Sequence, residues 1–270
     1  MKLQGVGVAK ERVFPGPCKI VDIEKGTQRT FEYNDRELVS KMTGDGFEVT
    51  LAYDDKGNVL KKKIMNRRLD ATYYYSWDAY NNLINIRYVP SDNPSKTLRY
   101  HAKLNYDGTP GPSDVVYSVD FDQRGFPNAH YFETRFNIAL LSLDAEISVE
   151  KKIKFNDKQQ PIAIDVMSTD NGGVPGEPTH TKIEYSELGR IKKIEQTNSM
   201  FKEHPDIREM QYDANNRLKR IVDSTWFDGQ YYQKKIEYSY DSAGNAVSVR
   251  EFEEGNTIRF EKYDYDCWVK

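Results

Sequence analysis

The stretch Tyr212-Asp213-Ala214-Asn215-Asn216-Arg217-Leu218 decides the fold, because its pattern recurs along the chain. In each copy an aromatic residue precedes Asp, Asn or Ser, and most copies carry Gly or Asn three positions later. A short polar side chain accepts backbone hydrogen bonds, and Gly or Asn tolerates the left-handed conformation of a type I turn with a bulge. Each copy therefore predicts a tight β-hairpin reversal. The eight copies begin at Tyr33, Tyr53, Trp77, Phe121, Phe155, Tyr185, Tyr212 and Tyr240, with a degenerate ninth at Tyr263.

The flanks of the motif predict strands with one buried face. The residue two positions before each aromatic is apolar, as at Ile183 and Tyr238, and the residue between is mostly small or polar. After the turn, apolar residues occur at the sixth and ninth positions, which a regular strand would place on opposite faces. We infer either a bulge after the turn or a second, weaker apolar face. Glu37 and Gln159 replace Gly or Asn in two copies and predict looser or differently shaped turns.

The organisation of the chain indicates one repeat domain. The motif recurs with no composition shift that would mark a linker, so residues 18–270 form one predicted domain and residues 1–17 a polar tether or trimmed N-terminus. Glycine-containing turns between successive copies are expected to close the other edge of a meander. Open twisted sheets rarely exceed about ten strands without curling. We therefore predict an all-β fold, an antiparallel meander of serial β-hairpin repeats that forms a large curled or coiled sheet.

Composition narrows the classes of partner. The formal net charge of -3 gives no electrostatic reason to expect nucleic acid or an acidic membrane as a partner. The mean hydropathy of -0.79 is low for a globular chain and favours a sheet that exposes a broad polar face. Basic clusters such as Lys61-Lys62-Lys63 are interpreted as a solvated face. No apolar run approaches the roughly twenty residues of a spanning helix, so no transmembrane segment is predicted. Residues 1–17 lack the hydrophobic stretch of a signal peptide.

Two cysteines, Cys18 and Cys267, lie near opposite ends of the chain. A disulfide would close a loop of about 250 residues and would imply an oxidising compartment. The alternative is two unpaired thiols. We expect the unpaired arrangement, because a coiled array need not bring its ends within bonding distance.

The sequence offers little catalytic chemistry. The histidines His101, His130, His180 and His204 show no metal-ligand spacing, and neither a phosphate-binding loop nor a nucleophile elbow occurs. No catalytic residue, metal site or cofactor is therefore predicted. Carboxylates such as Asp54, Asp55, Glu133, Asp144 and Asp165 are abundant, but a glycosidase pair is defined by a separation in space.

Aromatic residues are the candidates for binding. Tyrosine and tryptophan side chains offer a large contact area at a small entropic cost, and exposed rings can stack on sugars. Tyr73, Tyr75 and Trp77 share the face of the motif and are assigned to the core. The predicted binding residues are those outside that pattern, Tyr74, Trp226, Tyr231 and Tyr232.

The residues resemble the tyrosine-aspartate (YD) repeats of rearrangement-hotspot (RHS-like) proteins, whose consensus is Tyr-Asp-x-x-Gly-Arg-Leu. Residues 185–191 and 212–218 are similar copies, and the resemblance covers most of the chain after residue 30. The segment from Pro17 to Ile23, leading into Phe31-Glu32-Tyr33, also resembles the mature region of envelope lipoproteins from Bacteroides-like bacteria. Several copies lack the Gly, and the array is too short to enclose a toxin domain.

The resemblance implies an exported β-repeat protein, periplasmic or surface-exposed, whose repeats carry no catalytic residues. Repeat similarity is specific for architecture and weak for activity. We predict a non-enzymatic binding or scaffold module of the cell envelope, with a glycan or protein ligand on the exposed sheet face. The alternative is a polysaccharide-acting hydrolase or lyase with a carboxylate or tyrosine site on the loops of residues 91–100 or 170–180.

Overall fold

The computed structural model describes the whole chain except residues 1–13, 68, 112–145, 170–177, 199–201 and 269–270. The described residues form strands joined mostly by short turns, with one 3-10 helix, η1 (Asp266–Trp268). The strands are β1 (Lys19–Asp22), β2 (Thr27–Tyr33), β3 (Val39–Gly44), β4 (Phe47–Tyr53), β5 (Val59–Asn66), β6 (Asp70–Trp77), β7 (Leu83–Pro90), β8 (Leu98–Asp107), β9 (Glu146–Phe155), β10 (Pro161–Thr169), β11 (Thr179–Tyr185), β12 (Ile191–Asn198), β13 (Asp206–Tyr212), β14 (Leu218–Phe227), β15 (Gln230–Tyr240), β16 (Ala246–Glu253) and β17 (Asn256–Asp264).

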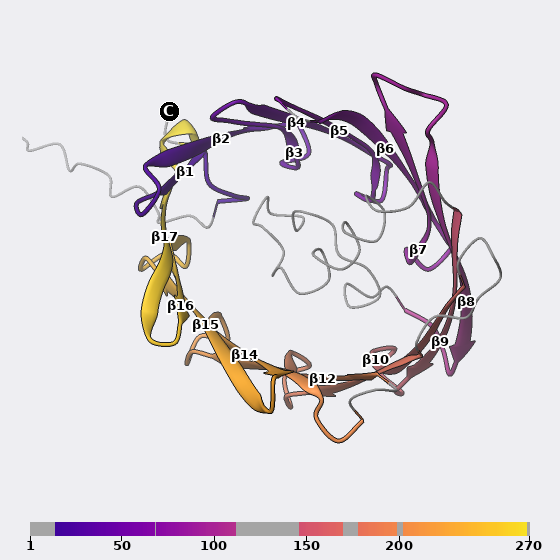
Figure 1. Cartoon of the computed structure of the whole chain (residues 1–270). Coiled ribbons are helices and arrows are strands. Elements are labelled where there is room, and N and C mark those ends of the chain that lie inside the picture. The colour runs from indigo at the N-terminus through magenta and orange to yellow at the C-terminus, as the bar shows by residue number, and fades with distance from the viewer. Residues whose placement is uncertain (1–13, 68, 112–145, 170–177, 199–201, 269–270) are drawn as a thin grey trace, which may run out of the picture.

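The strands close into a single barrel (Figure 1). Consecutive strands pair in chain order, and β1 pairs with both β2 and β17, so each described strand has a neighbour on both sides. The all-β class is confirmed, but the prediction of a curled or coiled sheet is wrong, because the sheet closes on itself as a barrel. Each strand is rotated relative to the last, so a meander this long can bring its first strand beside its last, and closure removes both exposed edges.

One strand pair departs from the predicted antiparallel meander. β8 and β9 pair in parallel, with Arg99 opposite Glu146 and Tyr106 opposite Ile153. Since the ring holds 17 strands, their directions cannot alternate all the way round, and one parallel pair is required. The motif copy that begins at Phe121 lies outside the described residues.

The described motif turns share one geometry. Asp54 shows it, because its Oδ1 atom accepts the backbone N–H groups of Lys56 at 2.9 Å and Asn58 at 2.8 Å. The prediction of looser turns at Glu37 and Gln159 is wrong, since their φ angles of 59° and 58° match the 60° of Asn216 in a regular copy. The asparagine caps of those two turns hold the reversal although its fourth residue is not Gly or Asn.

A β-bulge follows each of these turns. In the copy at Tyr212, Gln211 pairs with Arg220 but Tyr212 pairs with Leu218, which leaves Lys219 out of register. The same shift recurs in the other described copies. The extra residue of the bulge places the sixth and ninth positions of the motif on the same face of the sheet. Of the two predicted alternatives, the bulge is therefore confirmed, rather than a second apolar face.

The motif face of the sheet is the inside of the barrel. Ile221, Ile236 and Val249 lie on neighbouring strands of this face and are 0 to 2% exposed, whereas the alternate residues of the same strands are mostly polar and more accessible. Tyr73 is likewise buried, with Tyr75 and Trp77 packed against the same cluster, as predicted. Desolvation by burial raises the pKa of Tyr73 to about 12.

The inner face also carries buried charge, which the sequence pattern did not indicate. The Nε and Nη2 atoms of Arg208 donate to the two carboxylate oxygens of Asp223, each at 2.6 Å, and the Arg208 side chain is almost fully buried. Further pairs continue the network across β15, β16, β17 and β2, namely Lys234 with Glu251, Arg259 with Glu251, and Arg29 with Glu261. Buried ions need such partners, because removing one partner leaves an uncompensated charge.

The motif aromatics link successive hairpins at one end of the barrel, which we call the motif rim. The hydroxyl of Tyr212 donates to the backbone carbonyl of Ile191, the residue that begins the strand after the preceding motif turn, at 2.7 Å. Equivalent bonds join Tyr240 to Leu218, Tyr185 to Pro161, Tyr53 to Val39 and, through the indole Nε1, Trp77 to Val59. The aromatic position therefore also sets the spacing between repeats.

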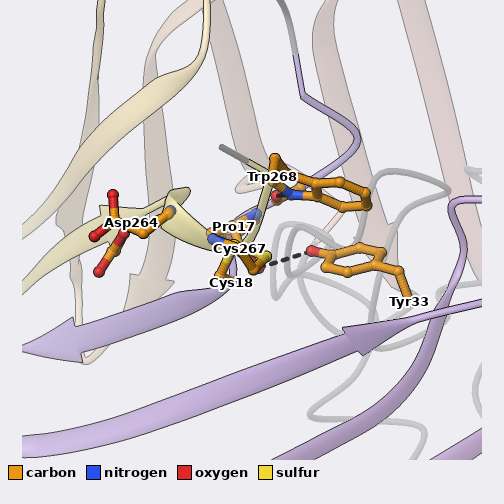
Figure 2. Close-up of a disulfide and its surroundings, with 8 residues drawn as sticks. Pro17, Cys18, Tyr33, Asp264, Cys267 and Trp268 are labelled. Atoms are coloured by element: carbon orange, nitrogen blue, oxygen red, sulfur yellow. Dashed lines mark hydrogen bonds between the residues drawn. A yellow bond between two sulfur atoms is a disulfide. The ribbon is translucent and has the colours of Figure 1, made fainter. Parts of the chain in front are cut away.

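Cys18 and Cys267 form a disulfide at the motif rim, where β1 meets β17 (Figure 2). The expectation of unpaired thiols is wrong, because closure of the ring brings the two Cα atoms to 5.7 Å. The Trp268 indole donates to the Gly16 carbonyl at 2.8 Å, and the Tyr33 hydroxyl donates to the Pro17 carbonyl at 2.8 Å. Residues 14–17, at the end of the segment interpreted as a tether, thus pack on the barrel seam.

Candidate functional site

A cluster of three contacting aromatic rings, which includes two of the predicted binding residues, lies at the end of the barrel opposite the motif rim. Trp226 and Tyr231 are directly opposed on β14 and β15, next to a tight Asp228-Gly229 turn. His204, which precedes β13, stacks on Trp226 with ring centroids 3.8 Å apart, and the Tyr231 ring meets the indole edge-on at 5.0 Å. We call these three residues the hairpin patch.

Backbone contacts hold the hairpin patch in place. The Tyr231 hydroxyl donates to the Pro205 carbonyl at 3.2 Å, and the Trp226 backbone N–H donates to Asp206 Oδ1 at 3.3 Å. Tyr231 is 39% exposed despite these contacts. The cluster therefore presents pre-oriented aromatic surface, and a ligand that stacks on it loses little additional side-chain entropy.

Tyr232 lies on the other face of the same hairpin. Its ring is 6.1 Å from that of Phe227, and its hydroxyl accepts a hydrogen bond from Gln230 Nε2 at 2.7 Å. Phe227 is 68% exposed, one of the most exposed large apolar side chains among the described residues. The β14–β15 hairpin thus offers aromatic rings on both of its faces.

Tyr74 is separate from this cluster. It lies on the outer face of β6, which is eight strands from β14 in a ring of 17, and Figure 1 shows the two strands on opposite walls. The Tyr74 ring is 36% exposed. The guanidinium of Arg87 lies 4.4 Å from the ring centroid and the Lys61 ammonium lies 5.8 Å from it. The four predicted binding residues therefore divide between two distant surfaces.

The carboxylates and histidines considered for catalysis are structural or dispersed in the described residues. Asp54 caps a turn, and Asp165 on β10 pairs with His180 on β11 on the outer wall. No group of three or more metal-ligating side chains occurs in the part of the chain that the structure describes. Glu133, Asp144 and His130 lie outside that part. Within the same part, no helix is long and apolar enough to cross a membrane.

Sequence reasoning missed the partners of the predicted aromatics. His204 has no role predicted from the sequence, yet its ring stacks on Trp226. The interpretation of Lys61-Lys62-Lys63 as a solvated face is wrong for Lys62, which is 6% exposed and whose ammonium lies 5.2 Å from the Tyr73 ring centroid. Lys61 is exposed, as predicted, and lies beside Tyr74. The sequence did indicate where to look, because Tyr74 and Trp226 fall outside the alternation that assigns residues to the buried face. The neighbours of these residues follow only from the register between strands, which a single sequence does not show.

No protein-family model matches this sequence, and no curated protein matches it. Among solved structures, a porin-like protein from Bacteroides uniformis is similar at a TM-score of 0.44 with 10% sequence identity, over 94% of this chain and 99% of that one. The TcdB2–TccC3–Cdc42 complex is similar at a TM-score of 0.31 with 11% identity, over 88% of this chain and 11% of that one. The Photorhabdus luminescens Tc holotoxin pore is similar at a TM-score of 0.30 with 11% identity and the same coverage.

Proposed function

We propose that this chain is a non-enzymatic binding module of the bacterial cell envelope that contacts a glycan through the hairpin patch. The observation that carries the proposal is the fixed stack of His204 and Trp226, with the exposed ring of Tyr231 beside it. Sugar rings present apolar C–H faces to such surfaces, and the nearby backbone carbonyls can accept hydroxyl hydrogen bonds. A closed barrel supplies the rigid support.

The character of the outer wall supports a barrel that stands in water. Charged side chains such as Lys63, Lys152 and Lys182 lie near the middle of their strands, at positions that face outward, and are exposed. A lysine or arginine on the lipid-facing side of a membrane barrel costs about 2–4 kcal/mol at the midplane. Because many strands carry such residues, we place the barrel outside the hydrocarbon layer, on the surface or in the periplasm.

The disulfide supports the assignment to the envelope. Bridges such as Cys18–Cys267 persist in oxidising compartments and are rare in the cytosol. In a bacterium, this chemistry favours a location beyond the inner membrane.

A glycan array followed by titration of tryptophan fluorescence tests the proposed ligand. We expect a bound glycan to perturb Trp226 emission, and Trp226→Ala or Tyr231→Ala to weaken binding at least about tenfold, as loss of a stacking ring does. Tyr80→Ala is the matched control, since Tyr80 is 45% exposed but lies on a motif turn at the other end of the barrel. If no glycan binds, or if the control variant loses as much affinity as the patch variants, the proposed ligand is wrong.

A further inference from the structure

A row of cations crosses the outer wall around Tyr74. Successive strand pairings place Lys61 opposite Tyr74, Tyr74 opposite Arg87, and Arg87 opposite Arg99. The row therefore runs across β5, β6, β7 and β8 and spans about 14 Å, because neighbouring strands lie roughly 4.8 Å apart. All four side chains are exposed. We call this row the cationic strip.

One carboxylate residue neighbours the strip at its end, since Glu146 on β9 lies opposite Arg99, but Lys61 and Arg87 face no carboxylate across the strands. Among the described residues, none of its three cations forms an ion pair, whereas the nearby Lys63 pairs with Asp70 at 3.9 Å and Lys103 with Glu150 at 3.1 Å. The outward residues on either side of Tyr74 along β6 are Thr72 and Ser76, which are uncharged. Three positive charges thus stand together on a chain whose formal net charge is -3.

The opposition of Arg87 and Arg99 is unfavourable in the free protein. Like charges directly opposite each other on adjacent strands destabilise a sheet. An anion placed between the two guanidinium groups would convert this repulsion into attraction. Arginine binds carboxylate or sulfate through two parallel hydrogen bonds, and stacking on an aromatic face limits its motion beforehand. Arg87 meets that condition, because it lies 4.4 Å from the Tyr74 ring centroid.

We propose that the cationic strip binds an acidic polysaccharide, whose carboxylate or sulfate groups pair with Arg87 and Arg99 while a sugar ring packs beside Tyr74. The strip lies on the wall opposite the hairpin patch, so it is a second site and does not depend on the first. A flat anionic membrane fits less well, because the row runs around a convex wall and curves away from any plane. Single-stranded nucleic acid uses successive stacking rings, and this strip has one.

The same barrel carries a matched control on another wall. Phe260 on β17 lies 4.4 Å from the Arg250 guanidinium and 5.7 Å from the Lys262 ammonium, so a ring with two cations is repeated there. In that location Arg250 lies directly opposite Glu237, which also pairs with Arg220 at 2.9 Å. The aromatic–cation geometry is similar, but here the arginine beside the ring faces a carboxylate, whereas Arg87 faces Arg99.

The experiment measures binding of polygalacturonate oligomers to the intact oxidised protein, with dextran sulfate and neutral dextran in parallel. We expect polygalacturonate or dextran sulfate to bind, neutral dextran not to bind, and affinity to fall as salt rises. Arg87→Gln/Arg99→Gln should weaken binding at least about tenfold, the scale of a lost charge-assisted contact. Arg250→Gln/Lys262→Gln should leave it unchanged, and the difference between the two acidic polymers distinguishes carboxylate from sulfate recognition.

Several results would overturn the proposal. Equal losses in the strip and control variants would indicate general charge attraction. Tighter binding to single-stranded DNA or to phosphatidylglycerol vesicles than to either acidic polymer would assign the strip to another partner. Trp226→Ala should not change binding of the acidic polymer, so failure of the hairpin patch and failure of the cationic strip can be told apart. Tyr74→Phe, which keeps the ring, should retain affinity, whereas Tyr74→Ala should lose it.

Discussion

Removal of the disulfide is expected to lower the stability of the barrel by a large and calculable amount. Cys18 and Cys267 are 249 residues apart in sequence. In the chain-entropy model, a closed loop of this length reduces the entropy of the unfolded chain by about 18 cal/mol/K, which is about 5 kcal/mol at 25 °C. The native state should change little, because β1 already pairs with β17 over residues 19–22 and 261–264.

The double substitution Cys18→Ser/Cys267→Ser tests this value by equilibrium unfolding in urea, followed by far-ultraviolet circular dichroism. With a urea m-value of about 3 kcal/mol/M, the midpoint should fall by about 1.5–2 M. The m-value should rise, because the uncrosslinked unfolded chain exposes more surface. Native spectra of the two proteins should superimpose.

A reductant provides the control for this experiment. Dithiothreitol should shift the midpoint of the wild-type protein by the same amount and leave that of the serine variant unchanged. Coincident unfolding curves for the oxidised protein and the variant would refute the reasoning, since they would mean that the unfolded chain is not constrained by the bridge.

Three further outcomes concern the motif turns. Glu37→Gly should raise the free energy of unfolding by about 1 kcal/mol in thermal unfolding, because the φ of 59° at Glu37 is strained for a residue with a side chain. Gly244→Ala, at a φ of 101°, should lower the free energy of unfolding by about 1 kcal/mol. A loss of stability in Glu37→Gly together with a gain in Gly244→Ala would contradict the assignment of backbone strain to these positions. Tyr212→Phe should cost about 1 kcal/mol in urea unfolding by removing the bond to the neighbouring repeat, and an unchanged midpoint would show that this bond contributes nothing. The backbone N–H of Arg217, more than the guanidinium of the same residue, lowers the pKa of Asp213 in the folded protein. The ionised Asp213 therefore stabilises the fold fully above the unfolded pKa of about 3.9, and this stabilisation is lost as pH falls through the lower folded pKa. Asp213→Asn should flatten the fall of the urea midpoint between pH 5 and pH 3, and a parallel fall in both proteins would exclude this carboxylate as a cause.

The hairpin turns and the two faces of the strands could be predicted because both depend on short-range rules. The cap at Asp54 reaches amides two and four residues away, and the alternation of buried and exposed positions follows from the pleat of one strand. The assignment of Tyr74 to the outer face and of Tyr73 to the core follows from the same alternation. The shape of the turn at Glu37 was mispredicted, since the side-chain cap of Asn34 outweighs the left-handed preference of the fourth residue.

Barrel closure, the disulfide and the neighbours of each binding residue were decided by tertiary structure. The accumulated twist and the number of strands determine whether β1 reaches β17, and no local pattern encodes that sum. The register between strands sets which charges meet, as it does where Arg87 faces Arg99 across β7 and β8. The sequence alone thus determined the individual hairpins, whereas contacts between residues far apart in the chain exist only once the ring has closed.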